Sequence, residues 1–389
     1  MKKIAIVVQR YGSEVNGGAE KYAKDLAEHL KDYYDVEVLT TTALDYDTWH
    51  PYYQEGEQII NGVRIRRFKV KKERKIKRFS CIDGLLRRLP FCACILETLW
   101  IKEQGPYCPQ LIQYIKKKNN DFDKFIFITY LYYTTVKGLP LVHKKAVFVP
   151  TAHDEYCIYF HIYKKLFKKA SRIVCLTQEE QEFIEQKFPN QGTQYSVAGV
   201  GIEIPLHRKE WEAYRQKVMP EHYIVYLGRV DHSKGCDRLF EYYERYCREK
   251  RDFPELVVAG KCMMNVPQTP YIHYMGMVSE NEKYALLEGA EGLIMPSEHE
   301  SLSLVVLEAM AFGIPVIVNG NCKVLVGHIN KSNSGLKYRN YREFAIAVDS
   351  VLQNEEFRKK TRTKGPDYVH ADYSWENTIE VFKEAIEGL

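Results

Sequence analysis

No uncharged run in this sequence is long enough to cross a membrane. The two longest are FIFITYLYYTTV at residues 125–136 and AMAFGIPVIVNGNC at residues 309–322, and a spanning helix needs roughly 20 apolar residues. The opening MKKIAIVVQRYG has too short an apolar stretch for the core of a secretion signal and is typical of a buried strand. We therefore expect a cytoplasmic protein.

Several other signals are also missing. The sequence has no low-complexity tract and no GxGxxG fingerprint, which argues against a nicotinamide cofactor. The ten cysteines, including Cys81, Cys92, Cys94 and Cys108, match no zinc-binding spacing. They are most simply reduced thiols that fill apolar space.

The basic residues are unevenly distributed. The net charge is +5, but ten of the fifteen residues at 64–78, RIRRFKVKKERKIKR, are basic and one is acidic. This segment is either a solvated loop or a patch for anionic lipid head groups, and the apolar stretch at 81–100 is either a surface-lying segment or a pair of core helices. We favour the membrane surface, which would allow a peripheral position on the inner face of the cell membrane. Nucleic acid is not expected, because no nucleic-acid-binding motif accompanies the run.

Short apolar runs alternate with helical patterns along the whole chain, as in residues 19–31. This alternation predicts parallel sheets with helices on both faces. The length and a Gly- and Pro-containing break near 200–210 predict two Rossmann-like, doubly wound α/β domains facing across a cleft, at residues 1–203 and 204–372, with a C-terminal helix at 373–389 that completes the first. The predicted strands are residues 2–8, 36–40, 124–129, 146–150, 172–177, 195–199, 223–228, 255–260, 272–276, 292–297, 315–320 and 335–338.

Two acidic residues frame an apolar run at residues 298–317, EHESLSLVVLEAMAFGIPVI. Ser301 or Ser303 predicts a helix cap, and Gly313 with Pro315 predicts the end of that helix. The helix N-terminus would offer free N–H groups to an anion such as phosphate. Glu300 in the preceding loop and Glu308 on the helix would then hold hydroxyl groups on either side of the phosphate, which indicates a nucleotide sugar.

Residues that follow other strands support this site. Arg229 and Lys234, in GRVDHSKGCD after a predicted strand, can reach a shared phosphate because glycines, Gly228 among them, flank them. Gly17 and Gly18 follow the first strand and allow close approach of a ligand. His153, in TAHDE at the end of another strand, is either a structural residue or a catalytic one.

Glu300-x(7)-Glu308 with AMAFGIPVI, together with GRVDHSKGCD and NGGAE, resembles the retaining glycosyltransferases of family four, which have the GT-B fold. The resemblance implies that Glu308 binds ribose hydroxyls, that Glu300 faces the transferred sugar, and that Arg229 and Lys234 neutralise the departing phosphate. It also implies that His153 lies near the reacting centre. The remaining donor-binding residues that it implies are Gly17, Gly18, Gly228, Met277, Val278, Ser301, Leu302, Ser303 and Leu304.

The sequence departs from the family pattern at two places. Ala198 precedes Gly199 where the family often has Asn-Gly. The first glutamate is often followed by Gly-Phe-Gly, but here by Ser301, Leu302 and Ser303, and the missing glycines restrict the loop whose amides would meet the diphosphate.

These features together predict a retaining hexosyltransferase that uses a UDP- or GDP-sugar, with a glycan or lipid-linked acceptor in cell-envelope polysaccharide synthesis. The nucleotide sugar is a substrate, and we expect no cofactor and no essential metal. The alternatives are a nucleotide-sugar epimerase of the same architecture, a non-catalytic nucleotide-sugar-binding protein, and a glycoside hydrolase with two acids flanking the bond. The hydrolase would leave Arg229 and Lys234 without a role.

Overall fold

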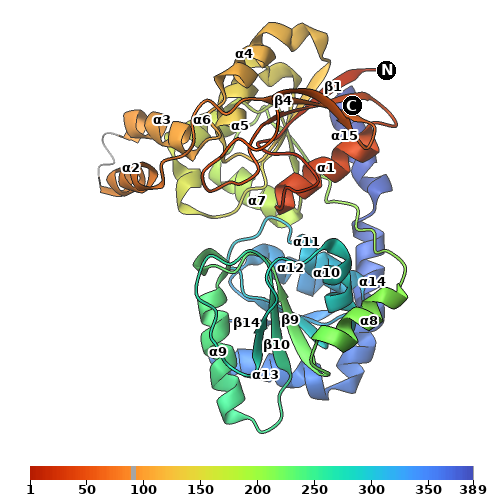
Figure 1. Cartoon of the computed structure of the whole chain (residues 1–389). Helices are drawn as coiled ribbons and strands as arrows, with labels where there is room; N and C mark the ends of the chain where they lie inside the picture. The colour runs from red at the N-terminus through yellow and green to blue at the C-terminus, as the bar shows by residue number, and fades with distance from the viewer. Residues whose placement is uncertain (89–92, 389) are drawn as a thin grey trace. The chain divides into compact units, whose positions relative to one another are not determined.

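The computed structural model describes residues 1–88 and 93–388. The chain forms two compact units, Met1–Val200 with Trp375–Leu389, and Gly201–Ser374 (Figure 1). The first division therefore lies three residues before the predicted one at 203, and the chain returns to the first unit at Trp375 rather than at residue 373.

The N-terminal unit is built on one sheet, which has eight strands within the described residues, in the order β3-β4-β2-β1-β5-β6-β7-β8. All neighbouring pairs are parallel except β3 with β4. The expectation of a purely parallel sheet is wrong at this edge, because Asn61 and Gly62 have φ values of 50° and 80° and turn the chain back as a tight hairpin. The strands are β1 Lys3–Val7, β2 Asp35–Thr41, β3 Gly56–Ile60, β4 Val63–Phe68, β5 Lys124–Ile128, β6 Ala146–Val149, β7 Arg172–Cys175 and β8 Gln194–Val197.

Helices cover this sheet, and the C-terminal helix is one of them. The ring of Trp375, at the start of α15, stacks on His29 of α1 with centroids 3.9 Å apart. Thr378 Oγ1 donates to the carbonyl of Ala198, 3.1 Å away, so α15 belongs to the N-terminal unit. The α-helices of the unit are α1 Gly18–Leu30, α2 Ile76–Arg88, α3 Ala93–Gln104, α4 Pro109–Lys118, α5 Tyr133–Gly138, α6 His161–Lys169, α7 Gln178–Lys187 and α15 Trp375–Glu387, and the 3₁₀ turns are η2 Asn119–Asp121, η3 Leu139–Leu141, η4 His143–Lys145 and η5 Tyr156–Tyr159.

The basic segment at 64–78 is not one continuous loop, and only part of its charge is exposed. Its first part is β4, and its last residues begin α2. Arg66 donates to Glu37 at 2.7 Å and contacts Glu57 at 2.8 Å. Lys72 and Arg78 both contact the buried Glu103, and Arg67 is buried. Acidic residues outside the segment therefore neutralise Arg66, Lys72 and Arg78, whereas four of its lysines are exposed. Of the apolar stretch, residues 81–88 belong to α2 and residues 93–100 to α3, and these two helices contact each other.

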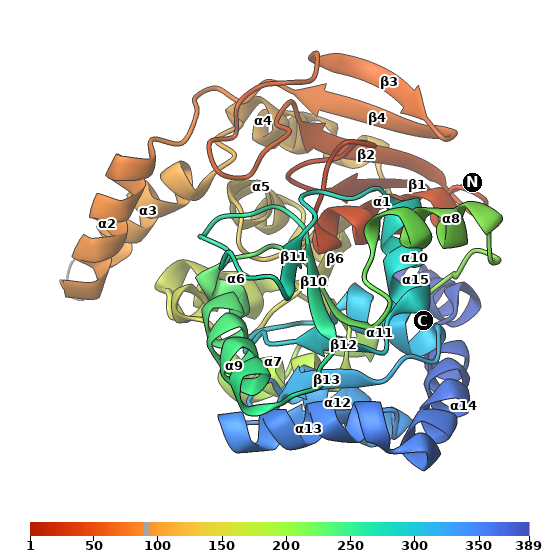
Figure 2. The ribbon, with the colours of Figure 1, turned by 60° about the horizontal axis from the view of Figure 1, so that its bottom comes forward.

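The C-terminal unit contains a wholly parallel sheet of six strands in the order β11-β10-β9-β12-β13-β14 (Figure 2). Helix α9 contacts α13, whereas α14 contacts α11 and α12. The strands are β9 Tyr223–Leu227, β10 Glu255–Ala259, β11 Ile272–Tyr274, β12 Gly292–Met295, β13 Val316–Asn319 and β14 Gly335–Tyr338, and the helices are α8 Lys209–Val218, η6 His232–Lys234, α9 Cys236–Glu249, α10 Glu280–Gly289, α11 Leu304–Ala311, α12 Lys323–Ser332, α13 Tyr341–Gln353 and α14 Glu355–Asp372.

Each sheet has a point at which the strand order reverses. In the C-terminal unit β9 lies between β10 and β12, and in the N-terminal unit β1 lies between β2 and β5. Every residue of β9, β12 and β13 is buried, as expected of strands covered on both faces. Ligands of such sheets bind outside the carboxyl ends of the strands at the reversal.

Candidate functional site

The N-terminus of α11 lies after β12, beside the reversal point of the C-terminal sheet. Ser303 is the residue before the helix, as predicted, but its side chain makes no capping hydrogen bond, so the predicted Ser cap is wrong. Its φ is 68°, a left-handed conformation that serine adopts at a cost. The backbone N–H groups of Leu302, Ser303 and Leu304 have no hydrogen-bond acceptor among residues 1–88 and 93–388. They are therefore available to an anion.

Glu300 precedes this helix and is held by a lysine. Lys234 Nζ donates to Glu300 Oε1 at 2.6 Å. The loop after β9 brings Lys234 there because Gly235, with φ 75°, lies so close to the end of β12 that an added Cβ would be 2.7 Å from the carbonyl oxygen of Pro296. Only glycine fits this approach.

Arg229 belongs to the same loop. It forms an ion pair with Asp231, and its Nη2 donates to Ser233 Oγ at 3.0 Å. Asp231 also accepts the backbone N–H of Lys234 at 2.9 Å, so one carboxylate orders the loop that carries both cations. The backbone of Gly228 packs directly against Gly260. A Cβ on Gly260 would be 1.9 Å from the carbonyl oxygen of Gly228, so this contact requires glycine at position 260.

Glu308 lies on the second turn of α11 and is only 4% exposed. Its Oε1 accepts from Lys283 Nζ at 2.6 Å. Lys283 was not among the predicted site residues. It lies on α10, which begins with a capping box of Ser279 and Glu282, and this S-x-x-E signal in the sequence could have located the helix. Each of the two framing carboxylates thus holds one lysine.

A buried histidine supports the loop before α11 and was also missed. His328 Nε2 lies 2.7 Å from the carbonyl oxygen of Leu302. Because a carbonyl only accepts, Nε2 carries the proton, and Nδ1 accepts from Tyr368 Oη at 2.9 Å. Tyr373 Oη lies 3.2 Å from that phenol, and the Tyr373 carbonyl accepts the N–H of Ile202 at 2.9 Å. The network therefore connects the loop to the segments where the chain enters and leaves this unit.

The predicted residues of the base seat lie between β11 and α10. Met277 is half exposed, and it follows Gly276, whose φ is 72°. The structure places Met277 and Val278 ahead of Lys283 on the same connection. Their role in base binding stays a prediction.

The other three predicted residues belong to the N-terminal unit. An added Cβ on Gly17 would be 2.2 Å from Glu20 Oε2, whereas one on Gly18 would meet nothing within 4 Å. Glycine at position 17 therefore accommodates the buried pair of Glu20 and Arg10, and Gly18 leaves the start of α1 open.

His153 follows β6, and its Nε2 lies 3.4 Å from Glu155. The loop is fixed by Glu180, whose carboxyl group accepts the N–H groups of Ala152 and Leu176. Burial raises the pKa of Glu180 to about 7, against the opposing effect of these two bonds. The structure places Gly17, Gly18 and His153 in a different compact unit from the residues around α11.

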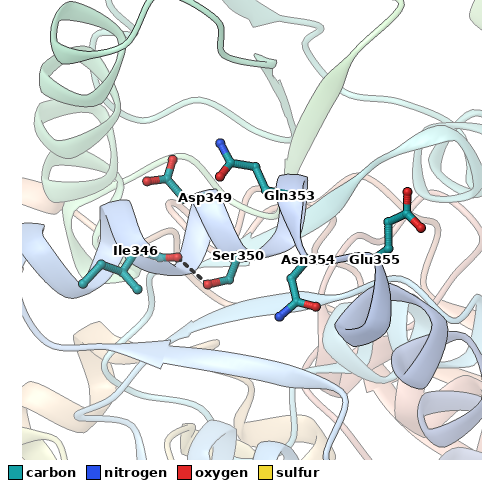
Figure 3. A pocket seen from close by; sticks show the side chains of 6 residues that line it. All are labelled: Ile346, Asp349, Ser350, Gln353, Asn354 and Glu355. Atoms are coloured by element: carbon teal, nitrogen blue, oxygen red, sulfur yellow. Dashed lines mark hydrogen bonds between the residues drawn. The ribbon is translucent and has the colours of Figure 1, made fainter.

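A hollow in the surface lies elsewhere, at the junction of α13 and α14 (Figure 3). Asp349 in it already accepts from Tyr246 and Lys250, and Ser350 donates to the carbonyl of Ile346 at 2.7 Å. It holds none of the predicted residues. The residues that line it are Ile346, Asp349, Ser350, Gln353, Asn354 and Glu355.

Two further searches cover only the part of the chain that the structure describes. No three His, Cys, Asp or Glu side chains gather there as a metal site would need; Cys81 and Cys94 are exposed and Cys108 is buried, and Cys92 lies outside the described residues. No helix in the same residues combines the length and the apolar character that crossing a bilayer requires.

The fold belongs to a known class. The structure matches sucrose-phosphate synthase from Thermosynechococcus elongatus with a TM-score of 0.72 at 16% identity, over 100% of this chain and 99% of that one. It matches HepE of Anabaena in complex with UDP and glucose with a TM-score of 0.70 at 14% identity, over 100% of both chains. The two parallel-sheet α/β units are those of the GT-B fold, as predicted.

The family comparison concerns the unit that carries the site. Residues 207–368 match the family described as "Glycosyl transferases group 1". An uncharacterized glycosyltransferase of Methanocaldococcus jannaschii is 29% identical over 43% of this chain and 46% of its own, so the match spans about half of that relative. An uncharacterized glycosyltransferase of Haemophilus influenzae is 24% identical over 98% of this chain and 99% of its own.

A third relative has a more specific name. N,N'-diacetylbacillosaminyl-diphospho-undecaprenol alpha-1,3-N-acetylgalactosaminyltransferase of Campylobacter jejuni is 22% identical over 51% of this chain and 55% of its own. The similarity to the group 1 glycosyltransferases thus covers residues 207–368.

Proposed function

We propose that this protein is a retaining glycosyltransferase of family four that transfers a hexose from a UDP- or GDP-sugar to a glycan or lipid-linked acceptor. The observation that carries the proposal is the N-terminus of α11, with three available N–H groups between Glu300 and Glu308. Such a terminus suits a diphosphate, and carboxylates suit hydroxyl groups. Solved relatives of the same fold carry UDP and UDP-glucose.

The residues divide the donor between them in this proposal. The backbone N–H groups of Leu302, Ser303 and Leu304 bind the diphosphate. Glu308 accepts hydrogen bonds from the ribose hydroxyls once Lys283 releases the carboxylate oxygen that it contacts. Met277 and Val278 bind the base. Glu300 faces the sugar. Lys234, which contacts Glu300, also contacts the phosphate in this proposal.

The chemistry follows from where charge develops. When the bond between the anomeric carbon and the diphosphate oxygen breaks, that oxygen gains negative charge. Arg229, Lys234 and the helix N-terminus stabilise this charge. The acceptor hydroxyl attacks from the face that the diphosphate leaves, and its proton passes to the departing phosphate oxygen, which retains the anomeric configuration. No step in this account requires a metal ion.

The acceptor is proposed to be a glycan or a lipid-linked glycan of the cell envelope. The names of two relatives support this kind of acceptor. One is an O-antigen chain mannosyltransferase of Escherichia coli, and the name of the Campylobacter jejuni enzyme contains a diphospho-undecaprenol-linked sugar. In the segment 64–78, the exposed lysines are Lys69, Lys71, Lys75 and Lys77, and Ile95 of α3 is 72% exposed. These residues are suited to an anionic membrane surface.

The test of the activity is a thermal-shift panel of nucleoside diphosphates and nucleotide sugars, followed by assays of nucleoside diphosphate release. A bound ligand raises the midpoint in proportion to its concentration over Kd. The transferase releases nucleoside diphosphate only with an acceptor present. Conversion of the donor without an acceptor indicates an epimerase, binding without release indicates a non-catalytic protein, and the absence of any shift contradicts the proposal.

The membrane contact has its own test. Changing Lys69, Lys71, Lys75 and Lys77 to Glu should abolish binding to vesicles of anionic phospholipid. The matched control reverses the exposed Lys116, Lys117 and Lys118 on α4 and should leave vesicle binding intact. Equal binding by both variants would reject the membrane surface.

A further inference from the structure

One arginine of the basic segment is buried without an acidic partner. Arg67 lies on β4 and is 1% exposed. Its Nη1 donates to the backbone carbonyl of Tyr11. No carboxylate forms an ion pair with it in residues 1–88 and 93–388, in contrast with Arg66 beside it.

The two other nitrogens of Arg67, Nε and Nη2, have no hydrogen-bond partner in the described part of the chain. They lie on one edge of the planar guanidinium and point their N–H groups the same way. This edge is the fork that binds two oxygens of a carboxylate or phosphate side-on. The geometry therefore leaves free the pair of donors that an oxyanion needs.

Polar side-chain atoms on neighbouring segments also have no hydrogen-bond partner in the described residues. They include Tyr11 Oη and Thr40 Oγ1. Thr40 is the register partner of Arg67 on the adjacent strand β2. All of these groups lie at or beyond the carboxyl ends of β1, β2 and β4, which is the edge of a doubly wound sheet where ligands bind.

A removable side chain covers the arginine. The ring of Tyr53 lies over the guanidinium, with its centroid 4.0 Å from Cζ. Tyr53 comes from a loop whose other residues at 52–56 are exposed, and its backbone is held by one bond to Thr42, 3.0 Å long. A rotation of this side chain would remove one group that packs on the guanidinium without moving a strand.

We propose that Arg67 is an oxyanion-binding residue of the acceptor site, and that the acceptor carries a phosphate or carboxylate group that displaces Tyr53. A buried charge without a counter-ion is costly, and an anionic acceptor would supply the counter-ion. The identification of the ligand as the acceptor rests on the proposed function, whereas the oxyanion site itself does not.

The experiment measures thermal shifts with the donor site already filled by saturating nucleoside diphosphate, so that added anions do not bind at α11. The probes are glucose 1-phosphate, glucuronate and neutral glucose. For the wild type, at least one anionic sugar should raise the midpoint by several degrees beyond glucose. The phosphate and carboxylate probes distinguish the two sources of the oxyanion.

Three variants decide the assignment. Arg67→Met should lose the increment from the anionic sugar and keep the shift from nucleoside diphosphate. Arg67→Lys, which keeps the charge without the fork, should lose at least tenfold in affinity for the anionic probe, and it replaces Arg67→Met if that variant does not fold. The control is Arg64→Met on the same strand, whose side chain faces solvent, and it should behave as the wild type.

Two results would overturn the proposal. One is an equal response of the wild type to glucose and to both anionic sugars. The other is an unchanged increment in Arg67→Met and Arg67→Lys. Failure of the nucleoside diphosphate to shift any of these proteins would instead count against the proposed function.

Discussion

Cations at two strand-end sites of the chain, one in each unit, are compensated in opposite ways. Around α11, Lys234 pairs with Glu300, Lys283 with Glu308, and Arg229 with Asp231. At the corresponding edge of the N-terminal sheet, Arg67 has a carbonyl and an aromatic ring but no carboxylate in the described residues. Both sites lie at the carboxyl ends of strands, the α11 site beside the reversal of strand order and Arg67 on β4, two strands from the reversal at β1.

This difference predicts how a ligand would bind at the α11 site and at the Arg67 site. In the C-terminal unit, a donor arrives as an anion with hydroxyl groups and exchanges partners within lysine–carboxylate pairs that are already formed. Each of these three cations already has a carboxylate partner, so the ligand is not needed to balance their charge. In the N-terminal unit the compensation has to come from outside, so the ligand itself completes the electrostatics.

The largest effect should come from the cations that face the leaving group. Lys234→Ala and Arg229→Ala should each reduce kcat by about 100- to 1000-fold, because each removes one preplaced donor to the developing charge. The measurement is nucleoside diphosphate release at saturating donor. Lys337→Ala, an exposed lysine of β14, is the control and should keep full turnover. Near-normal rates in both site variants would remove these residues from the mechanism.

The next prediction compares the two units directly. Lys283→Met leaves Glu308, 4% exposed, without its cation, and should lower the free energy of unfolding by roughly 1–3 kcal/mol. Arg67→Met removes an uncompensated charge and should not lower it. Denaturant unfolding of the ligand-free proteins measures both changes.

A control for this pair is Lys331→Met, an exposed position on α12, which should change stability little. Nucleoside diphosphate should also stabilise Lys283→Met by more than it stabilises the wild type, since the ribose hydroxyls then no longer compete with Lys283 for the carboxylate. If Arg67→Met proved the more destabilised of the two, the contrast between the units would be wrong.

The sequence predicts most of the fold because most of its strands are continuous apolar runs. All six strands of the C-terminal unit lie within the predicted ranges. The hairpin of β3 and β4 was missed although Asn61-Gly62 is a strong turn signal. The arginines around Ile65 obscure the alternation of apolar and polar residues that marks a strand, because Arg67 is buried. Charge density alone did not reveal that Arg67 faces inward.

The site was predictable only as far as it follows strand ends and helix starts. Glu300, Glu308, Arg229 and Lys234 were selected in this way, and the structure pairs Lys234 with Glu300. The roles of Lys283 and His328 arise from contacts between elements distant in sequence, and no local pattern encodes those contacts.

A smaller effect should follow from loosening the support of the anion site. His328→Leu removes the donor to the Leu302 carbonyl and should weaken nucleoside diphosphate binding about tenfold, the equivalent of one buried hydrogen bond. His328→Gln keeps a donor at that distance and should restore most of the affinity. Calorimetric titration measures both, and kcat at saturating donor should change little. Equal affinities in the Leu and Gln variants would show that the hydrogen bond is not what positions the loop.

The smallest effect concerns the backbone of the same loop. Ser303 has φ 68° and makes no side-chain cap, so Ser303→Gly relieves a left-handed conformation that costs an L-residue about 1 kcal/mol. We expect the midpoint of the C-terminal unit to rise by about 2–4 °C. Ser303→Ala keeps the strain and should give no rise, so equal midpoints for the Gly and Ala variants would contradict the assignment. The glycine also enlarges the conformational freedom of the N–H groups, so its nucleoside diphosphate affinity should fall slightly while stability rises. Lower affinity together with higher stability would mean that the strained loop before α11 is preorganised for its ligand. The Arg67 site, where the charge is not compensated, is not preorganised in this way.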